Sequence, residues 1–105
     1  MRVIDFGKLG GPVYVGRPNG EEARQRLNVE ELDSAPGVID VVIPEGTYSI
    51  NSSYFLGLFG PSVIHFGSEE AFFEHYRFRG PSKDIDKVHL HAERALREQG
   101  VLKLA

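Results

Sequence analysis

Apolar positions along the chain follow two periodicities, one typical of strands and the other of helices. Residues 38–43 read Val-Ile-Asp-Val-Val-Ile, a nearly continuous apolar run interrupted only by Asp40. Such a run is typical of a strand buried on both faces at the centre of a parallel or mixed sheet. We expect Asp40 to lie at a sheet edge or to pair with backbone or an arginine. Shorter apolar runs predict strands at 2–6, 12–15 and 76–78.

Between these strands, apolar residues at three- and four-residue spacing predict helices. Asn19, with a glutamate three residues later, is typical of a capping box at the start of the first helix. Asn28 repeats this signal, so we expect the first helical segment to break near Leu27 and restart. The pair Pro36-Gly37 ends it.

The helix predicted after Asn51 has the clearest start signal in the chain. Ile50 and Phe55 flank the Asn51 cap at the spacing of a hydrophobic staple. Pro61 lacks an N–H group and is expected to kink this helix, which then continues to about residue 65. Gly67 is expected to end it.

Two further helices are predicted towards the C-terminus. Ser68 is expected to cap a short helix over 69–75, and a last helix is expected over 84–99, with His89 on its buried face. The resulting order, β-β-α-β-α-(α)-β-α, predicts an α/β fold in which helices cover a mixed sheet of four to five strands. The 105 residues are expected to form a single domain, 1–105.

Composition narrows the function classes. A hydrophobic content of 41% and a charged content of 26% are typical of globular proteins, and the formal net charge of −3 argues against nucleic-acid binding. The absence of cysteine excludes disulfides and thiolate metal sites, and it favours a cytoplasmic location. No apolar run reaches the ~20 residues that cross a bilayer, and the N-terminal residues lack a signal-peptide pattern, so no membrane association is expected.

The residues best suited to bind an anion or to be phosphorylated lie where the predicted strand 38–43 leads into the Asn51 helix. Backbone N–H groups at a helix start are unpaired and the dipole there is positive, so the position suits an anion or a phosphorylated serine. We expect Asn51, Ser52, Tyr54 and Thr47 to line the site. The structural alternative stays open, in which Asn51 caps the helix and the serines are ordinary first-turn residues.

Other catalytic and metal-binding patterns are weak. The four histidines, His65, His75, His89 and His91, have no spacing that brings three or four ligands together. No Gly-x-Ser-x-Gly motif or phosphate-binding loop is present, so we predict no enzymatic activity and no cofactor. Aromatic residues are dense between positions 54 and 78. Most of them are expected to lie in the core, and part of the excess to form a partner or self-association surface.

The strand–turn–Ser-Ser arrangement resembles the STAS domain of sulfate transporters and anti-sigma factor antagonists. The antagonists have Asp-Ser-Ser-Gly-Leu-Gly after an apolar strand, where this chain has Asn-Ser-Ser-Tyr-Phe-Leu-Gly over 51–57. The resemblance implies that Ser53 is the phosphoacceptor, modified by a partner kinase that also acts as anti-sigma factor. Asn51 stands at the position of the acid, and bulkier residues replace the small Gly-Leu pair.

The chain is also similar to the small bacterial STAS-like family of unknown function, over residues 38 to 99. The matching segments are 50–55 (Ile-Asn-Ser-Ser-Tyr-Phe), 58–60 (Leu-Phe-Gly) and 69–73 (Glu-Glu-Ala-Phe-Phe). This resemblance implies a regulatory protein–protein interaction domain, switched at Ser53, with a histidine-kinase-like ATPase or anti-sigma-type kinase as partner. A homodimer, and a small anion- or nucleotide-binding module at Asn51–Ser53, remain open as alternatives.

Overall fold

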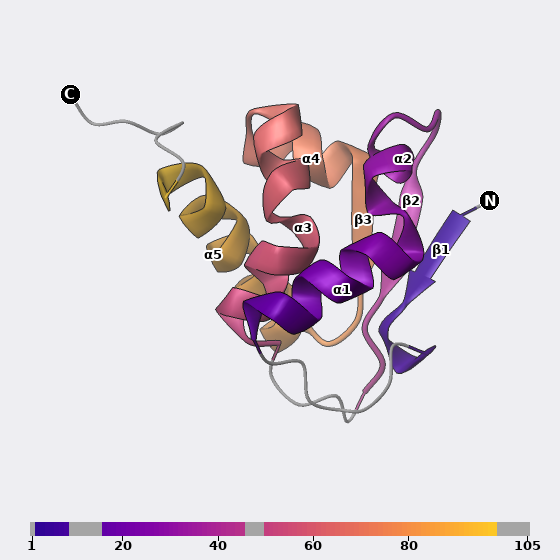
Figure 1. Cartoon of the computed structure of the whole chain (residues 1–105). Coiled ribbons are helices and arrows are strands. Elements are labelled where there is room, and N and C mark those ends of the chain that lie inside the picture. The colour runs from indigo at the N-terminus through magenta and orange to yellow at the C-terminus, as the bar shows by residue number, and fades with distance from the viewer. Residues whose placement is uncertain (1, 9–15, 46–49, 99–105) are drawn as a thin grey trace.

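The computed structural model describes residues 2–8, 16–45 and 50–98. Strands and helices alternate along these residues (Figure 1). The elements are β1 (Arg2–Asp5), the 3-10 turn η1 (Phe6–Lys8), α1 (Arg17–Leu27), α2 (Val29–Asp33), β2 (Ile39–Val42), α3 (Ser52–Phe66), α4 (Glu69–His75), β3 (Tyr76–Arg79) and α5 (Ser82–Glu98).

The described strands form one parallel sheet in the order β1-β2-β3. Ile4 of β1 pairs with Val41 of β2, which pairs with Phe78 of β3. The apolar run predicted as a central strand is therefore central, and the α/β class is confirmed. The expected mixed sheet of four to five strands is not found, because the described residues contribute three strands, all parallel. The strand predicted at 12–15 lies outside the described residues.

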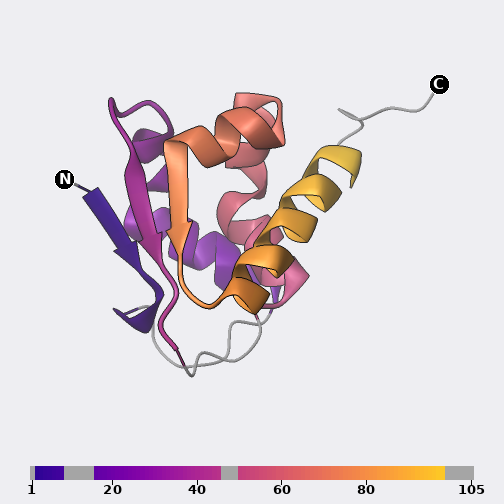
Figure 2. The same cartoon turned by 180° about the vertical axis from the view of Figure 1, so that it is seen from behind.

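Helices cover one face of this sheet. Figure 2 shows the three strands towards the viewer, with α1 and α2 behind them and α5 beyond the β3 edge. Ile4 and Val41 are buried, whereas Val3 is exposed and Asp40 and Val42 are half-buried. The expectation that β2 is buried on both faces is therefore wrong, because its alternate side chains point away from the helices.

The expected arginine partner of Asp40 lies on the neighbouring strand. Arg79 of β3 places its Nε atom 3.1 Å from Asp40 Oδ1, and the two form an ion pair on the less covered face of the sheet. This pairing explains how a single carboxylate is accommodated in an otherwise apolar strand.

Helix α3 forms the centre of the core. Phe55 and Phe59 are fully buried on it, and the Phe59 ring lies 5.7 Å from Phe72 and 5.2 Å from Tyr76. Edge-to-face and tilted contacts of this kind add stability beyond the buried area. The aromatic residues are mainly core, as expected. Among the described residues, the exposed large hydrophobic side chains are Val3, Val38 and Leu90, and none is aromatic.

The start of α1 differs from its prediction. The helix begins at Arg17 after Gly16, with Pro18 in its first turn, so Asn19 lies inside the helix and is not its cap. Proline is well suited to the first turn because no helical partner exists there for its missing N–H. The predicted break after Leu27 is confirmed, since Asn28 adopts a left-handed conformation with φ of 54° between α1 and α2.

The later helices agree closely with their start and stop signals. Helix α3 continues through Pro61 to Phe66, and Gly67, with φ of 81°, ends it. Ser68 caps α4 by accepting a hydrogen bond from the Ala71 N–H at 3.1 Å. Helix α5 begins two residues before its predicted start. His89, expected on the buried face of α5, is exposed and packs against the Phe73 ring, so that assignment is wrong.

Helices α1 and α3 cross with their backbones in direct contact. A Cβ atom built on Gly20 would lie 2.1 Å from the Tyr54 carbonyl oxygen, and one built on Gly57 would lie 2.3 Å from the Arg17 carbonyl oxygen. Real Cβ atoms do not approach backbone this closely. The crossing therefore requires glycine on both helices, as at other close helix contacts where small residues let the backbones meet.

We expect Gly57→Ala to lower the free energy of unfolding by about 2 kcal/mol or more in urea titrations. The added methyl group forces α1 away from α3, and this overpacking outweighs the gain in helix propensity of about 1 kcal/mol.

Gly60→Ala is the matched control in the same helix. A Cβ atom at Gly60 meets nothing closer than the Leu56 side chain at 3.9 Å. Its propensity gain is opposed by crowding against the Pro61 ring, so a change within about 1 kcal/mol is expected. Equal effects of the two substitutions would contradict the close crossing.

Candidate functional site

The first turn of α3 carries the predicted site residues. The Asn51 side chain accepts a hydrogen bond from the Ser53 N–H at 2.8 Å, which makes Asn51 the N-cap. Ser52 and Ser53 follow as the first two helical residues, and both are half-buried. The serine pair thus opens a helix at the surface of the molecule, as the sequence predicts.

Arg94 of α5 lies against this helix start. Its Nη1 atom donates to the Ser52 hydroxyl oxygen at 2.7 Å, and its Nε atom donates to Glu98 at 2.6 Å. The hydrogen bond from Arg94 lowers the pKa of the Glu98 carboxyl below its usual value. Glu98 also lies 3.5 Å from Arg17 of α1, so a line of polar contacts joins the start of α3 to α1.

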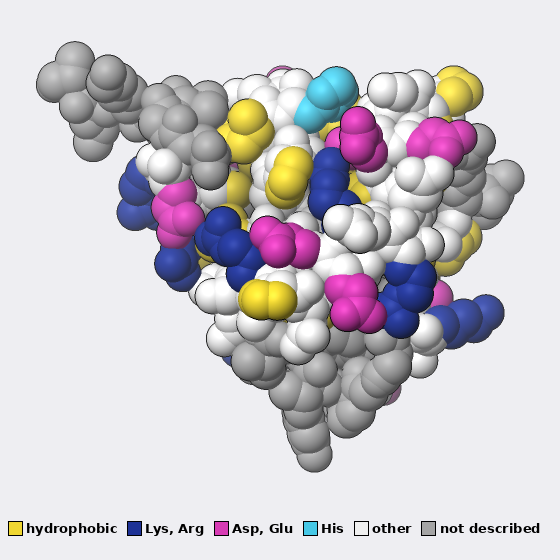
Figure 3. Space-filling model, in the orientation of Figure 1, with side chains coloured by type: hydrophobic (Ala, Val, Ile, Leu, Met, Phe, Trp, Pro, Cys, Tyr) yellow, Lys and Arg dark blue, Asp and Glu magenta, His cyan; other side chains and the backbone are white. Residues whose placement is uncertain are grey.

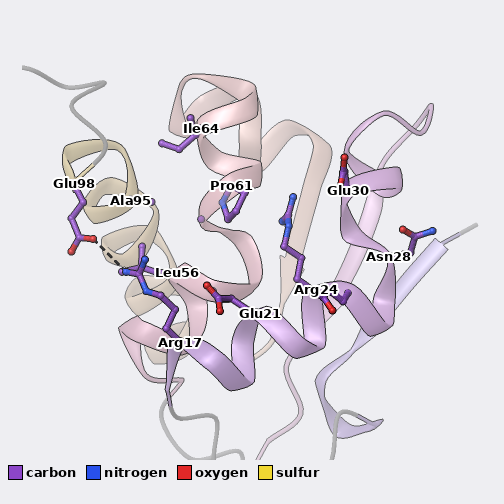
Figure 4. Close-up of a pocket in the computed structure, with 13 residues that line it drawn as sticks. Arg17, Glu21, Arg24, Asn28, Glu30, Leu56, Pro61, Ile64, Ala95 and Glu98 are labelled. Carbon is purple, nitrogen blue, oxygen red and sulfur yellow. Dashed lines mark hydrogen bonds and ion pairs between the residues drawn. The ribbon is translucent and has the colours of Figure 1, made fainter.

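A groove of about 750 Å³ opens beside this line of contacts, between α1, α3 and α5. In Figure 3 apolar and charged side chains alternate across this face, and Figure 4 shows Pro61 and Ile64 of α3 opposite Glu21 and Arg24 of α1. The groove is lined by Arg17, Glu21, Arg24, Gln25, Asn28, Glu30, Leu56, Gly57, Gly60, Pro61, Ile64, Ala95 and Glu98.

Arg24 is held in place by buried partners beneath the groove. Its Nη1 atom donates to the Leu58 carbonyl at 2.9 Å and to the Ser62 hydroxyl at 2.8 Å, and its Nη2 atom lies 3.2 Å from Asp33. Tyr76 donates to the same Asp33 carboxylate at 2.5 Å. Burial, together with Asp33, raises the pKa of Tyr76 far above its usual value. The Arg24 guanidinium is therefore bound by buried partners, although its side chain borders the groove.

The structure brings some of the predicted site residues together. Asn51, Ser52 and Ser53 lie together at the start of α3. Tyr54, predicted to line the site, is only 4% exposed and belongs to the core, because its position on α3 faces the interior. Thr47 lies outside the described residues. The site at the surface therefore comprises a cap, two hydroxyls and the neighbouring arginine.

Sequence reasoning missed Arg94, Glu98 and Arg17. The four-residue spacing of Arg94 and Glu98 on one helix could have indicated their ion pair. Their contact with Ser52 joins residues 42 positions apart and depends on how α5 packs against α3, so no local pattern indicates it.

The described residues contain no group of three or more His, Cys, Asp or Glu side chains placed to hold a metal ion. Two histidines contact backbone instead: His75 Nε2 lies 2.7 Å from the Leu32 carbonyl oxygen, and His91 Nε2 lies 3.0 Å from that of Ile50. Within the described ranges, every helix is too short or too polar to cross a membrane.

Comparisons with known proteins return no relative: no family model, no curated protein and no solved structure matches this chain. Function is therefore inferred from the geometry of the groove and of the start of α3.

His91 anchors the residue that leads into α3. It donates through Nε2 to the Ile50 carbonyl while its ring contacts Phe55. Burial lowers the pKa of His91 below 6.5, helped by the charges of Arg94 and Lys87 and opposed by the hydrogen bond to Ile50. The folded state therefore favours the neutral ring.

We expect this histidine to make stability fall in acid. Because its folded pKa lies below the unfolded value, its contribution is complete above pH 6.5 and is lost as the pH falls below that value. His91→Gln keeps an N–H donor for Ile50 but cannot titrate. Urea unfolding at pH about 7.5 and about 5.5 should show a smaller loss for His91→Gln than for the wild type. Equal losses would contradict a neutral, half-buried histidine in the folded state.

Proposed function

We propose that this chain is a regulatory protein–protein interaction domain of the STAS-like kind, acting through the start of α3 and the adjoining groove. The observation that carries this proposal is the groove of about 750 Å³ with apolar residues among charged ones, opening beside the serine pair. Apolar surface left open along a helix is typical of sites that receive a partner segment. The strand–turn–helix position of the serines supports the same function.

Ser53 is the proposed switch. A phosphate adds about −1.5 to −2 charges, which the positive end of the α3 dipole favours. Arg94 contacts both Ser52 and Glu98, so a phosphate in this turn would compete with Glu98 for this arginine. The new charge would also repel or block a docked partner. The resemblance to anti-sigma factor antagonists makes a histidine-kinase-like ATPase or anti-sigma-type kinase the proposed partner.

Site-specific photocrosslinking in the cells that express the chain tests this function. A photoreactive residue replaces Gln25, an exposed position that lines the groove, or Val3, exposed on the edge strand β1. We expect a defined protein adduct from position 25 and none from position 3. Ser53→Glu should reduce the adduct about tenfold, the effect of ~1.4 kcal/mol of lost affinity, and Ser53→Ala should leave it unchanged.

The two parts of the proposal fail separately. Absence of an adduct from position 25 would reject the interaction surface. Equal adducts from the Ser53→Ala and Ser53→Glu chains, with no phosphate on Ser53 by mass spectrometry, would reject the switch.

A second function, binding of a small anion or nucleotide at Asn51–Ser53, is favoured by the Arg94 guanidinium that lies 2.7 Å from the Ser52 hydroxyl. A cation beside the positive end of a helix is typical of phosphate sites. We expect any thermal stabilisation by nucleotides or inorganic phosphate to be abolished by Ser53→Asp and reduced by Arg94→Gln. Stabilisation that survives both substitutions would place the anion elsewhere.

A further inference from the structure

The groove has an apolar floor on α3, formed by Leu56, Pro61 and Ile64, and Gly60 adds no side chain to it. Gly57 and Gly60 lie between Leu56 and Ile64 along α3, and Ala95 of α5 closes one side. Pro61 is exposed and Ile64 is half-buried, so apolar atoms remain open to the surface. Such a floor accepts the apolar side chains of another molecule.

The charges along the rim are not balanced. Arg17 is paired with Glu98, and Arg24 is paired with Asp33 beneath the groove. Glu21 and Glu30 are exposed groove residues, and neither forms an ion pair with a described residue. Figure 4 shows both on the α1–α2 side of the groove. Two carboxylates that form no ion pair within the described part of the chain thus border an apolar floor.

The walls of the groove are helical, which limits the form of its occupant. Backbone groups inside helices are already hydrogen-bonded, so α1, α3 and α5 offer no ladder to an extended peptide. A docked strand would leave its own N–H and C=O groups unpaired, whereas a helix satisfies its backbone internally. Side chains alone must therefore provide recognition, as in helix-in-groove complexes.

We infer that the groove binds an amphipathic basic helix of a partner protein. Leucine-like side chains of that helix lie on the floor formed by Pro61 and Ile64, beside Gly60. Its lysine or arginine side chains extend their apolar stems along the rim and place their charges beside Glu21 and Glu30. This inference rests on the proposed interaction function and specifies the chemistry of its partner.

The test uses the full chain, labelled with ¹⁵N, and a synthetic helical peptide of ~18 residues built from leucine and lysine in amphipathic register. Amide shifts should concentrate at Gly57, Gly60, Ile64 and Ala95. A peptide with glutamate in place of every lysine should bind at least about tenfold more weakly. The double variant Glu21→Gln/Glu30→Gln should weaken binding of the lysine peptide by about tenfold, because two attractive charge contacts are lost.

The matched control is Glu74→Gln/Asp86→Asn, which removes the same charge from exposed positions of α4 and α5 outside the groove. It should change affinity less than about twofold. An equal loss in both double variants, equal binding of the two peptides, or shifts spread over the whole surface would overturn the inference. Absence of peptide binding would also overturn the inference. If the crosslinked adduct at position 25 still formed, the interaction function would stand, and only the basic chemistry of the partner would be rejected.

Two other occupants are distinguished by the same spectra. The chain has no native cysteine, so a spin label on Leu104→Cys is specific. The chain that carries both ¹⁵N and the spin label is diluted into chain without either label, so that broadening arises within one molecule. Broadening of the Gly57 and Gly60 amides would then place the chain's own last residues in the groove. Concentration-dependent shifts of those amides without peptide would place a second copy there. Either result would overturn the inference.

Discussion

The backbone contact between α1 and α3 is the constraint on which the arrangement of this protein depends. With glycine at positions 20 and 57, the two helices meet without intervening side chains. This proximity brings Arg24 of α1 within hydrogen-bond distance of the Leu58 carbonyl and the Ser62 hydroxyl on α3. The groove opens where the face of α3 continues past this crossing with Gly60, Pro61 and Ile64. One close contact thus adjoins both the core and the candidate binding surface.

The buried ion pair beneath the groove is a consequence of that contact. Arg24 and Asp33 lose most of their hydration, a cost that is offset only when their remaining hydrogen-bonding groups are satisfied. Ser62 of α3 and Tyr76 of β3 supply those partners, so the network joins α1 and α2 to α3 and β3. Loss of one partner from such a pair typically costs about 3–5 kcal/mol. The groove therefore lies above a buried network of hydrogen bonds that joins α1, α2, α3 and β3.

Local signals in the sequence were sufficient for most helix boundaries. The Asn51 and Ser68 caps act on backbone groups two or three residues away, so they can be recognised without knowledge of the fold. At Asn19 the same signal was misleading, because Gly16 and a proline in the first turn start the helix earlier. The contact of Arg94 with Ser52 and the crossing at Gly57 depend on how distant helices pack. Neither the groove nor the single covered face of the sheet was predictable for that reason.

The Asp40–Arg79 pair on the less covered face has a consequence for the behaviour of the chain at high concentration. Without Asp40, residues 38–43 would form an uninterrupted stretch of valine and isoleucine, the composition from which amyloid-like steric zippers assemble. A single carboxylate in such a stretch acts as a gatekeeper, since identical strands stacked in register would bring like charges together. In the native sheet Arg79 neutralises the charge of Asp40. In a fibril built from residues 38–43, which do not include Arg79, this charge is uncompensated. The ion pair thereby favours the folded chain over its aggregate.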